Sequence, residues 1–385
     1  SALEAGTISA ASMIGALATM LVGGALADRV SRRASLIICP IIQAVALGTV
    51  AVLVQAHVTA ITPLAAAALC SGLAGGIQYA VSIPALRRIV PRAQIGEATA
   101  RGMGSYLGAR LIGAPLSGLL FSITRWVPFL ADAVSFVVIA VASALISKPL
   151  GPDSVEHTEK TSFMTDVRAG WRVVRRNSYL RLTIVWTALL NALMQGFILL
   201  FVALVLHRGG SASTVGIVNA LGLAGGVLGS VASSALLRRL PAKRLLFSSL
   251  WILVIALAPV AFVPEPWQIG ILLLVGMSMS VPLNAVLESY EVSMVPDDYS
   301  GRVAATTRFG SQALQWTGPL IAGTLSDRLG APAAVAALTA VLAALTISLL
   351  FFRSALSVLD QPLGNVKEIE IPEERPAAKV LTTGQ

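Results

Sequence analysis

The most informative shortage in this 385-residue sequence is of charged side chains. Charged residues make up 12% of the chain, whereas hydrophobic residues make up 56%. A soluble domain carries about 25% charged residues. So few charges cannot cover a water-facing surface of this size, so lipid must be the solvent for most of it.

Reactive and metal-binding side chains are also scarce. The two cysteines, Cys39 and Cys70, lie inside apolar runs without a partner motif, so neither a disulfide nor a metal site is expected. The histidines His57, His157 and His207 are too scattered to form a metal site. No P-loop and no Gly-x-Ser-x-Gly elbow occurs. We therefore expect no cofactor, no metal, no ATP-driven chemistry and no enzyme activity.

Acidic residues are outnumbered by basic ones, which gives a net charge of +9. The lysines and arginines do not gather on one face but recur in short segments between apolar runs. This distribution is typical of the cytoplasmic loops of membrane proteins, where positive charge accumulates. It indicates membrane topology and argues against a nucleic-acid partner.

The chain contains apolar runs of the length that crosses a bilayer, about 20 residues each. The sequence predicts eleven such spans, and a long polar stretch separates the first five from the last six. The predicted spans are 6–27, 34–55, 61–83, 100–123, 129–146, 182–206, 214–237, 245–263, 267–287, 304–325 and 331–352.

The polar stretch divides the chain into four parts. Within it, Phe163, Val167, Trp171 and Val174 have helical spacing, which predicts an amphipathic helix over 161–179 on the inner membrane surface. The tail is rich in proline and mixed charge and is expected to be disordered. The parts are an N-terminal bundle (1–147), a cytoplasmic linker (148–181), a C-terminal bundle (182–352) and a tail (353–385).

An internal repeat relates the two bundles. Early in each half the offset is 210 residues, as for Gly6 and Gly216 (216 − 6). Parallel repeats of this kind are typical of transporters built from two six-span halves. Because five spans precede the linker, the first span is expected to be missing, with residues 1–6 as an outer loop. Later pairs are 205 residues apart (318 − 113): Pro91 and Pro296, Gly96 and Gly301, Gly113 and Gly318, and Gly118 and Gly323.

Residues 23–33 read GGALADRVSRR and join the first two predicted spans. This segment resembles the signature loop of the major facilitator superfamily, G-x-L-A-D-R-x-x-R-R. The resemblance implies an all-α membrane fold of two pseudo-symmetric six-helix bundles, with a loop that latches the cytoplasmic side in the outward-facing state. The alternative is a positively charged membrane anchor. The latch candidates are Gly24, Asp28, Arg29, Arg32 and Arg33.

A second segment, 323–330, matches the same pattern around Asp327. The order of spans places it on the outer side, so Asp327 is expected to be an outer-loop residue that only imitates the signature. The repeat partner of Asp28 is Arg238 (238 − 28 = 210), which lacks the acid. The sequence therefore predicts a latch in the first half alone.

The predicted span 100–123 is rich in glycine and resembles the antiporter signature of the family's exporters. Such a helix is expected to pack closely and to kink at its proline. A plain packing motif is the alternative. The residues concerned are Gly104, Gly108, Gly113, Pro115 and Gly118.

Polar side chains inside the spans are the candidates for the transport pathway. Arg110 lies mid-span, where a charge is costly unless it faces a cavity or a partner. Asp132 is either a proton carrier or an anchor at a helix start. Amides in spans more often hold helices together than contact substrate. The candidates for a substrate cavity are Gln78, Arg110, Asn191, Gln195, Gln312, Gln315 and Trp316.

Segments 131–136 and 170–176 extend the resemblance to the branch of enterobactin and macrolide exporters. That branch implies a monomeric, multi-pass protein of the bacterial inner (plasma) membrane, in contact with lipid. It would export a small drug-like or siderophore molecule in exchange for protons by alternating access. The alternatives are an importer or lipid-moving relative, and a truncated membrane protein that transports nothing.

Overall fold

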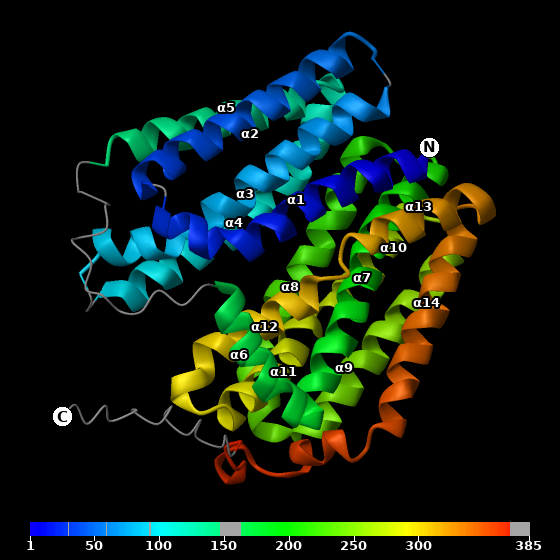
Figure 1. Cartoon of the computed structure of the whole chain (residues 1–385). Helices are drawn as coiled ribbons and strands as arrows, with labels where there is room; N and C mark the ends of the chain where they lie inside the picture. The colour runs from blue at the N-terminus through cyan, green and yellow to red at the C-terminus, as the bar shows by residue number, and fades with distance from the viewer. Residues whose placement is uncertain (30, 59, 92–93, 147–162, 370–385) are drawn as a thin grey trace, which may run out of the picture.

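The computed structural model describes residues 1–29, 31–58, 60–91, 94–146 and 163–369, and helices dominate it (Figure 1). None of the described residues lies in a strand, which confirms the all-α prediction. The long helices are α1 (Ala2–Arg29), α2 (Arg32–Gln55), α3 (Ile61–Ile89), α4 (Ile95–Ile123), α5 (Val127–Ala144), α6 (Phe163–Arg176), α7 (Ser178–His207), α8 (Ala212–Arg239), α9 (Ala242–Leu257), α10 (Pro266–Met277), α11 (Ser280–Met294), α12 (Asp297–Gln312), α13 (Thr317–Leu329) and α14 (Ala331–Ser348).

Ten helical segments among the described residues are long and apolar enough to cross a membrane. The N-terminal helices pair as α1 with α3 and α2 with α5, and the C-terminal ones as α8 with α10 and α9 with α14. In Figure 1 the N-terminal helices lie together across one side of the C-terminal ones. The protein therefore consists of two helical bundles.

The first helix is longer at both ends than the sequence predicted. It begins at Ala2, because the Glu4 backbone N–H donates to Ser1 Oγ (3.2 Å) while the Ser1 amino group donates to the Glu4 carboxylate (2.8 Å). It then continues through Arg29. The expected outer loop over 1–6 is therefore wrong, and the expected loop over 23–33 is helical as far as residue 29.

Two predicted spans are interrupted. The predicted span 304–325 is divided into α12 and α13 by a turn over 313–316, and the predicted span 267–287 is divided between α10 and α11 at 278–279. Each interruption lies about four residues before a proline, Pro319 or Pro282, whose ring nitrogen cannot donate to the carbonyl four residues earlier. The predicted span 267–287 still lies within one of the ten candidate membrane segments, Pro266–Met294, whereas 304–325 does not.

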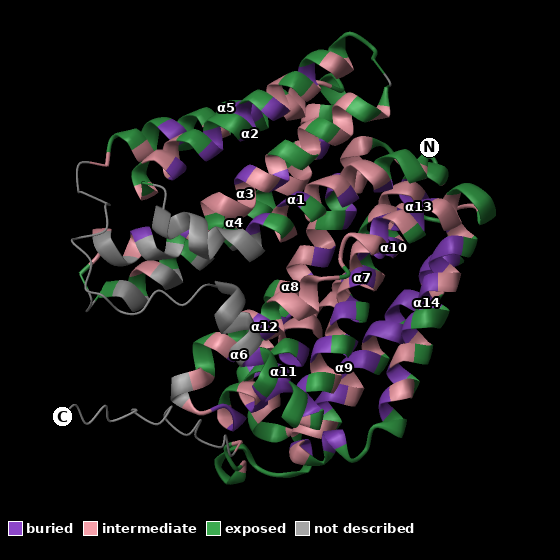
Figure 2. Ribbon diagram, in the orientation of Figure 1, coloured by how far each residue is buried: buried purple, intermediate pink, exposed green. Residues whose placement is uncertain are grey.

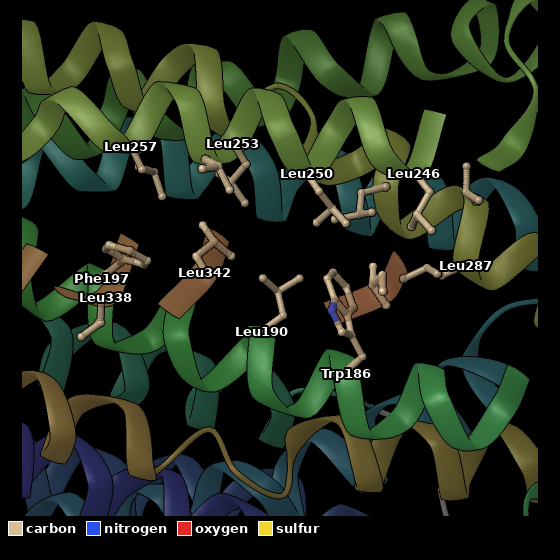
Figure 3. Close-up of a cluster of buried hydrophobic side chains, with 14 of the residues drawn as sticks. Trp186, Leu190, Phe197, Leu246, Leu250, Leu253, Leu257, Leu287, Leu338 and Leu342 are labelled. Carbon is tan, nitrogen blue, oxygen red and sulfur yellow. The ribbon is translucent and has the colours of Figure 1, made fainter. Parts of the chain in front are cut away.

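The large buried side chains lie in the C-terminal bundle, where the buried residues (purple in Figure 2) are concentrated. Phe197 of α7, Leu250 of α9 and Leu342 of α14 are almost fully buried and belong to one cluster that runs along the space between these helices (Figure 3). Trp186 lies in the same cluster and donates its ring N–H to the Leu345 carbonyl (3.2 Å). This bundle therefore has the larger hydrophobic core.

The linker helix α6 packs on the protein with a face that includes Val174 of the predicted apolar face but not Trp171. Its Gly170 lies against the Arg302 carbonyl of α12, and Val173 and Val174 are buried. Trp171, expected on the same apolar face as Val174, is 44% exposed. The side chains of residues 163–169 and the whole of 148–162 lie outside the described part of the chain.

The first half of the tail is folded. Leu356 and Leu359 are buried against the C-terminal bundle, and the Tyr290 hydroxyl donates to the Gln361 carbonyl (2.6 Å). The Ile369 N–H donates to the Met294 carbonyl (2.8 Å). The expectation of disorder is therefore wrong for 353–369, and residues 370–385 lie outside the described part.

Candidate functional site

The two bundles meet through glycines at the α1–α13 interface. Gly6 of α1 lies against the Pro319 carbonyl oxygen, and a Cβ added to Gly323 of α13 would lie 2.7 Å from the Ala2 oxygen. Real Cβ atoms do not approach backbone this closely. Only glycine therefore allows these two backbones to touch.

The α4–α8 interface is built in the same way. A Cβ added to Gly118 would lie 2.7 Å from the Ala212 oxygen, and one added to Gly216 would lie 2.7 Å from the Ala114 oxygen. The glycines of the two interfaces are repeat partners, with Gly6 equivalent to Gly216 and Gly118 equivalent to Gly323. The repeat found in the sequence is therefore also a repeat of contacts between the bundles.

Asp327 lies in the last turn of α13 and binds the start of α1. Its two carboxylate oxygens accept hydrogen bonds from the backbone N–H groups of Ala2 (2.9 Å) and Leu3 (3.0 Å). A carboxylate is favourable there because the first N–H groups of a helix have no partner within it. The bonds from Leu3 and Ala2 lower the pKa of the Asp327 carboxyl. Asp327, which was expected to be an outer-loop residue that only imitates the signature, joins the two bundles through these hydrogen bonds.

The α12–α13 turn is held by α7. Asn191, near the middle of α7, donates its side-chain N–H to the Ser311 carbonyl (2.9 Å) just before the turn. Just after the turn, Gly318 lies against the Ala192 carbonyl, and a Cβ added to Gly196 would lie 3.0 Å from the Gly318 oxygen. Discontinuous helices near the membrane midplane form the binding sites of many transporters.

The turn and its surroundings contain the amides predicted from the sequence. The structure brings four of the candidate residues to this region, and each is partly exposed. Their side chains form no hydrogen bond within the described residues, which leaves their polar groups available to a ligand. These four are Gln195, Gln312, Gln315 and Trp316.

One side-chain contact crosses between the bundles close to this turn. Nη1 of Arg308 in α12 lies 3.3 Å from the hydroxyl oxygen of Tyr79 in α3. Arg308 is exposed, and Tyr79 is 57% exposed. Sequence reasoning missed Arg308, which lies inside the predicted span 304–325 but near its start, whereas Arg110 was singled out because it lies mid-span.

Two other cavity candidates have neighbours in their own bundle. The Arg110 guanidinium lies over the Tyr106 ring, 5.7 Å from its centroid, and Nη1 lies 3.3 Å from the Tyr106 hydroxyl. Gln78 accepts a hydrogen bond from Gln43, which joins α2 to α3. Gln78 therefore links α2 to α3 through its hydrogen bond with Gln43. Arg110 is exposed and remains a candidate for the substrate cavity.

The glycine-rich helix α4 is continuous, with Pro115 inside it. A Cβ added to Gly104, Gly108 or Gly113 would meet nothing within 4 Å, and only Gly118 packs closely. The close packing expected of this helix is therefore found at one of its glycines. The other three lie on open surface in this structure.

The latch candidates are only partly described. The backbone of Gly24, Asp28 and Arg29 is helical, and their side chains lie outside the described part of the chain. Arg33 donates from Nη2 to the Ala144 carbonyl at the end of α5 (3.0 Å), and Arg32 is half-buried. Arg33 therefore binds within its own bundle in this arrangement.

Asp132 lies in the second turn of α5 and is exposed. The Ser135 hydroxyl lies 2.7 Å from its carbonyl oxygen and 3.4 Å from its Oδ1. No group of three or more histidine, cysteine or acidic residues that could bind a metal occurs among the described residues. The proton-coupling role of Asp132 stays a prediction.

Two bundles related by a parallel repeat, with an interrupted helix and polar side chains between them, are the architecture typical of secondary transporters. The sequence matches the family model described as "Major Facilitator Superfamily" over residues 1–319. The chain belongs to this superfamily, which confirms the resemblance at that level; the exporter branch stays a prediction.

Solved structures support the same fold. The crystal structure of a mutant form of the nucleoside transporter NupG aligns with a TM-score of 0.72 at 14% identity, covering 91% of this chain and 90% of that one. A second NupG crystal structure aligns with a TM-score of 0.69 at the same identity and coverage. At this identity the likeness establishes the fold alone. No curated protein matches the sequence at a significant level.

These findings make the chain a multi-pass membrane protein of a transporter family rather than an enzyme. Secondary transport of a small molecule is the activity that the fold supports.

Proposed function

We propose that the protein exports a small amphipathic compound by exchange for protons. The observation that carries this proposal is the arrangement of the bundles. They touch through backbone contacts at one end, and the ribbons of α1 and α12 diverge toward the other end (Figure 1). The basic segments predict that the diverging ends face the cytoplasm. Such an arrangement is open to substrate from the cytoplasm, a state that both exporters and importers visit. Export rather than import is proposed because segments 131–136 and 170–176 resemble the exporter branch.

Alternating access follows from these contacts. Moving to the outward-facing state separates the α1–α13 and α4–α8 interfaces at their outer ends and breaks the Asp327 hydrogen bonds to α1. The cytoplasmic ends then close, and the Asp28 latch acts in that state. Substrate binds between the bundles beside the α12–α13 turn, near Gln312, Gln315 and Trp316.

Protons drive the cycle through a carboxyl group inside a span. Asp132 is the predicted carrier. Glu291 of α11 is a second acid in a span, and it accepts a hydrogen bond from Thr307 of α12 (2.6 Å). Replacing each acid by its amide shows which of the two carries the proton, because only the substitution of the carrier should abolish the dependence of transport on the proton gradient.

The test measures accumulation of cationic, neutral and anionic fluorescent amphiphiles in cells that express the full gene, with and without an uncoupler. Export lowers accumulation of at least one compound, and the uncoupler removes the difference. The control is a strain that carries the Gly318→Leu variant. Its added side chain would overlap the Ala192 carbonyl, so the variant is not expected to fold normally or to transport.

Import is the second candidate, favoured by the structural likeness to a nucleoside transporter. Raised accumulation of a nucleoside or dye in the same assay would replace export by import. Identical accumulation of every compound with and without the protein would contradict both.

A further inference from the structure

Arg308 lies inside the predicted span 304–325, four residues from its start (308 − 304). It lies eleven residues after the start of α12 at Asp297 (308 − 297), which is about 16 Å along a helix. Tyr79 lies ten residues before the end of α3 at Ile89 (89 − 79), about 15 Å from the same side. The apolar layer of a bilayer is about 30 Å thick. Counted from the ends of the apolar stretches, however, Arg308 lies about 6 Å into the predicted span 304–325, and Tyr79 lies about 4.5 Å before the end of the stretch 61–82. The pair therefore lies between the bundles in the half of the apolar layer nearer the basic ends of these helices.

No carboxylate neutralises this arginine among the described residues. The Glu291 carboxylate of α11 accepts a hydrogen bond from Thr307 instead (2.6 Å). The partner of Arg308 is a neutral phenol, the Tyr79 hydroxyl. By contrast, Arg208 at the end of α7 donates to the Ala261 carbonyl (2.7 Å), so it has a backbone acceptor. Arg308 thus keeps most of its donors free on an exposed guanidinium.

A guanidinium has five N–H donors in a planar fork that fits a carboxylate, phosphate or sulfonate with two parallel hydrogen bonds. The Tyr79 hydroxyl can donate a third. Because Arg308 belongs to one bundle and Tyr79 to the other, an anion held by both would contact both moving parts.

We infer that Arg308 and Tyr79 form a subsite for an anionic group of the transported compound. The inference rests on the proposed transport between the bundles and adds the chemical class of the substrate, an amphipathic anion. The α12–α13 turn lies one to two helical turns further along the same span, where the Trp316 ring can contact the apolar part of that compound.

The test uses two fluorescent probes with one carbon skeleton. 8-Anilinonaphthalene-1-sulfonate carries an anion, and N-phenyl-1-naphthylamine lacks it. Binding of each is titrated to the purified full chain in lipid nanodiscs, with empty nanodiscs subtracted. We expect Arg308→Gln to weaken binding of the sulfonate about tenfold or more, since a charge-assisted pair is lost. Binding of the neutral probe should change less than about twofold.

Companion variants keep the result interpretable. Arg308→Lys retains the charge without the fork and should weaken sulfonate binding by an intermediate factor. Tyr79→Phe should weaken it about two- to fivefold. Arg353→Gln removes an exposed arginine beyond α14 and is the matched control, with no expected effect. Elution volume and melting temperature of each variant report folding.

The inference is overturned if wild type binds the two probes equally or binds neither. It is also overturned if folded Arg308→Gln binds the sulfonate as wild type does. Binding does not depend on an energy source, so the outcomes separate from those of the proposed function. Selective binding of the sulfonate without efflux of any compound would contradict the transport proposal but not this inference. Efflux of neutral dyes without selective binding of the sulfonate would contradict this inference but not the transport proposal.

Discussion

Gly113 in the N-terminal bundle and Gly318 in the C-terminal bundle are repeat partners with different surroundings. Gly318 lies against the Ala192 backbone of α7, whereas a Cβ on Gly113 would meet nothing within 4 Å. The same contrast extends to the cores, because the large buried cluster lies wholly within residues 173–359. The interfaces between bundles are nevertheless equivalent in both halves.

This comparison shows that the repeat reproduces the contacts between the bundles but not the packing inside each bundle. Contacts between bundles are reproduced by Gly6, Gly118 and their partners. Packing inside a bundle depends on which helices lie beside each other, and α7 has no counterpart against α4 in the described structure. The repeat predicts that the open face of α4 is the place for a helix equivalent to α7, and that stays a prediction.

The largest difference between the two bundles is expected when one methyl group is added to Gly113 or to Gly318. Gly318→Ala would overlap the Ala192 carbonyl and should destabilise the fold by about 2–3 kcal/mol or more, as overpacked sites do. Gly113→Ala should leave stability unchanged or slightly raised. Thermal unfolding of both variants in detergent, followed by loss of the monodisperse peak, measures the difference. An equal loss for Gly113→Ala would mean that a helix covers that face of α4.

A smaller effect is expected at the bond that holds the α12–α13 turn. Asn191→Ala leaves the Ser311 carbonyl without its donor and should reduce the free energy of unfolding by about 1–2 kcal/mol. Gln195→Ala, one turn along α7, removes a side chain that forms no hydrogen bond among the described residues and is the control. Thermal unfolding compares them, and equal stabilities of the two variants would show that Asn191 does not brace the turn.

The smallest effect concerns a difference between the two interfaces in the described residues. The α1–α13 interface has a carboxylate at a helix start, whereas α8 at the other interface is capped locally by Ser211. Asp327→Asn should shift the conformational equilibrium toward separated outer ends by about two- to threefold. Spin-label distances across the outer ends report this shift. Asp360→Asn, which loses an ion pair with Lys243 inside the C-terminal bundle, is the matched control.

The same contact predicts a pH dependence with a definite sign. The amides lower the pKa of Asp327 when the outer ends are closed. The closed state therefore gains from the carboxylate above its ordinary pKa of about 3.9, and the gain is lost as pH falls through the lowered value. Outer closure should be constant near neutral pH and weaken only in strong acid. A weakening between pH 7 and pH 5 that persists in Asp327→Asn would assign the effect to another group.

Much of the fold was predictable because apolar length and repeated residues are local signals. The bilayer-length spans, the repeat and the linker helix all follow from the sequence. The interruptions were not predictable from proline alone, since Pro40 and Pro115 lie inside continuous helices. Contacts from α7 accompany the interruption before Pro319, and such contacts are tertiary.

Part of the candidate site was accessible from the sequence for a similar reason, and its role stays a prediction. Residue type and position inside a span identified Gln312, Gln315 and Trp316, and the same criterion should have included Arg308. The partner of Asp327 is separated from it by more than 320 residues (327 − 3 = 324), so no local pattern shows it. Pairing across the bundles, such as Tyr79 with Arg308, requires the folded chain.

The glycine interfaces have a consequence for how the protein can evolve. At both interfaces backbone lies directly on backbone, so few side chains must interdigitate or change rotamer when one bundle rolls over the other. The residues through which the bundles touch are therefore different from the residues proposed to contact substrate. If the proposed subsite and alternating access hold, substitutions around Arg308 and the α12–α13 turn should change which compound is recognised without altering the contacts between the bundles.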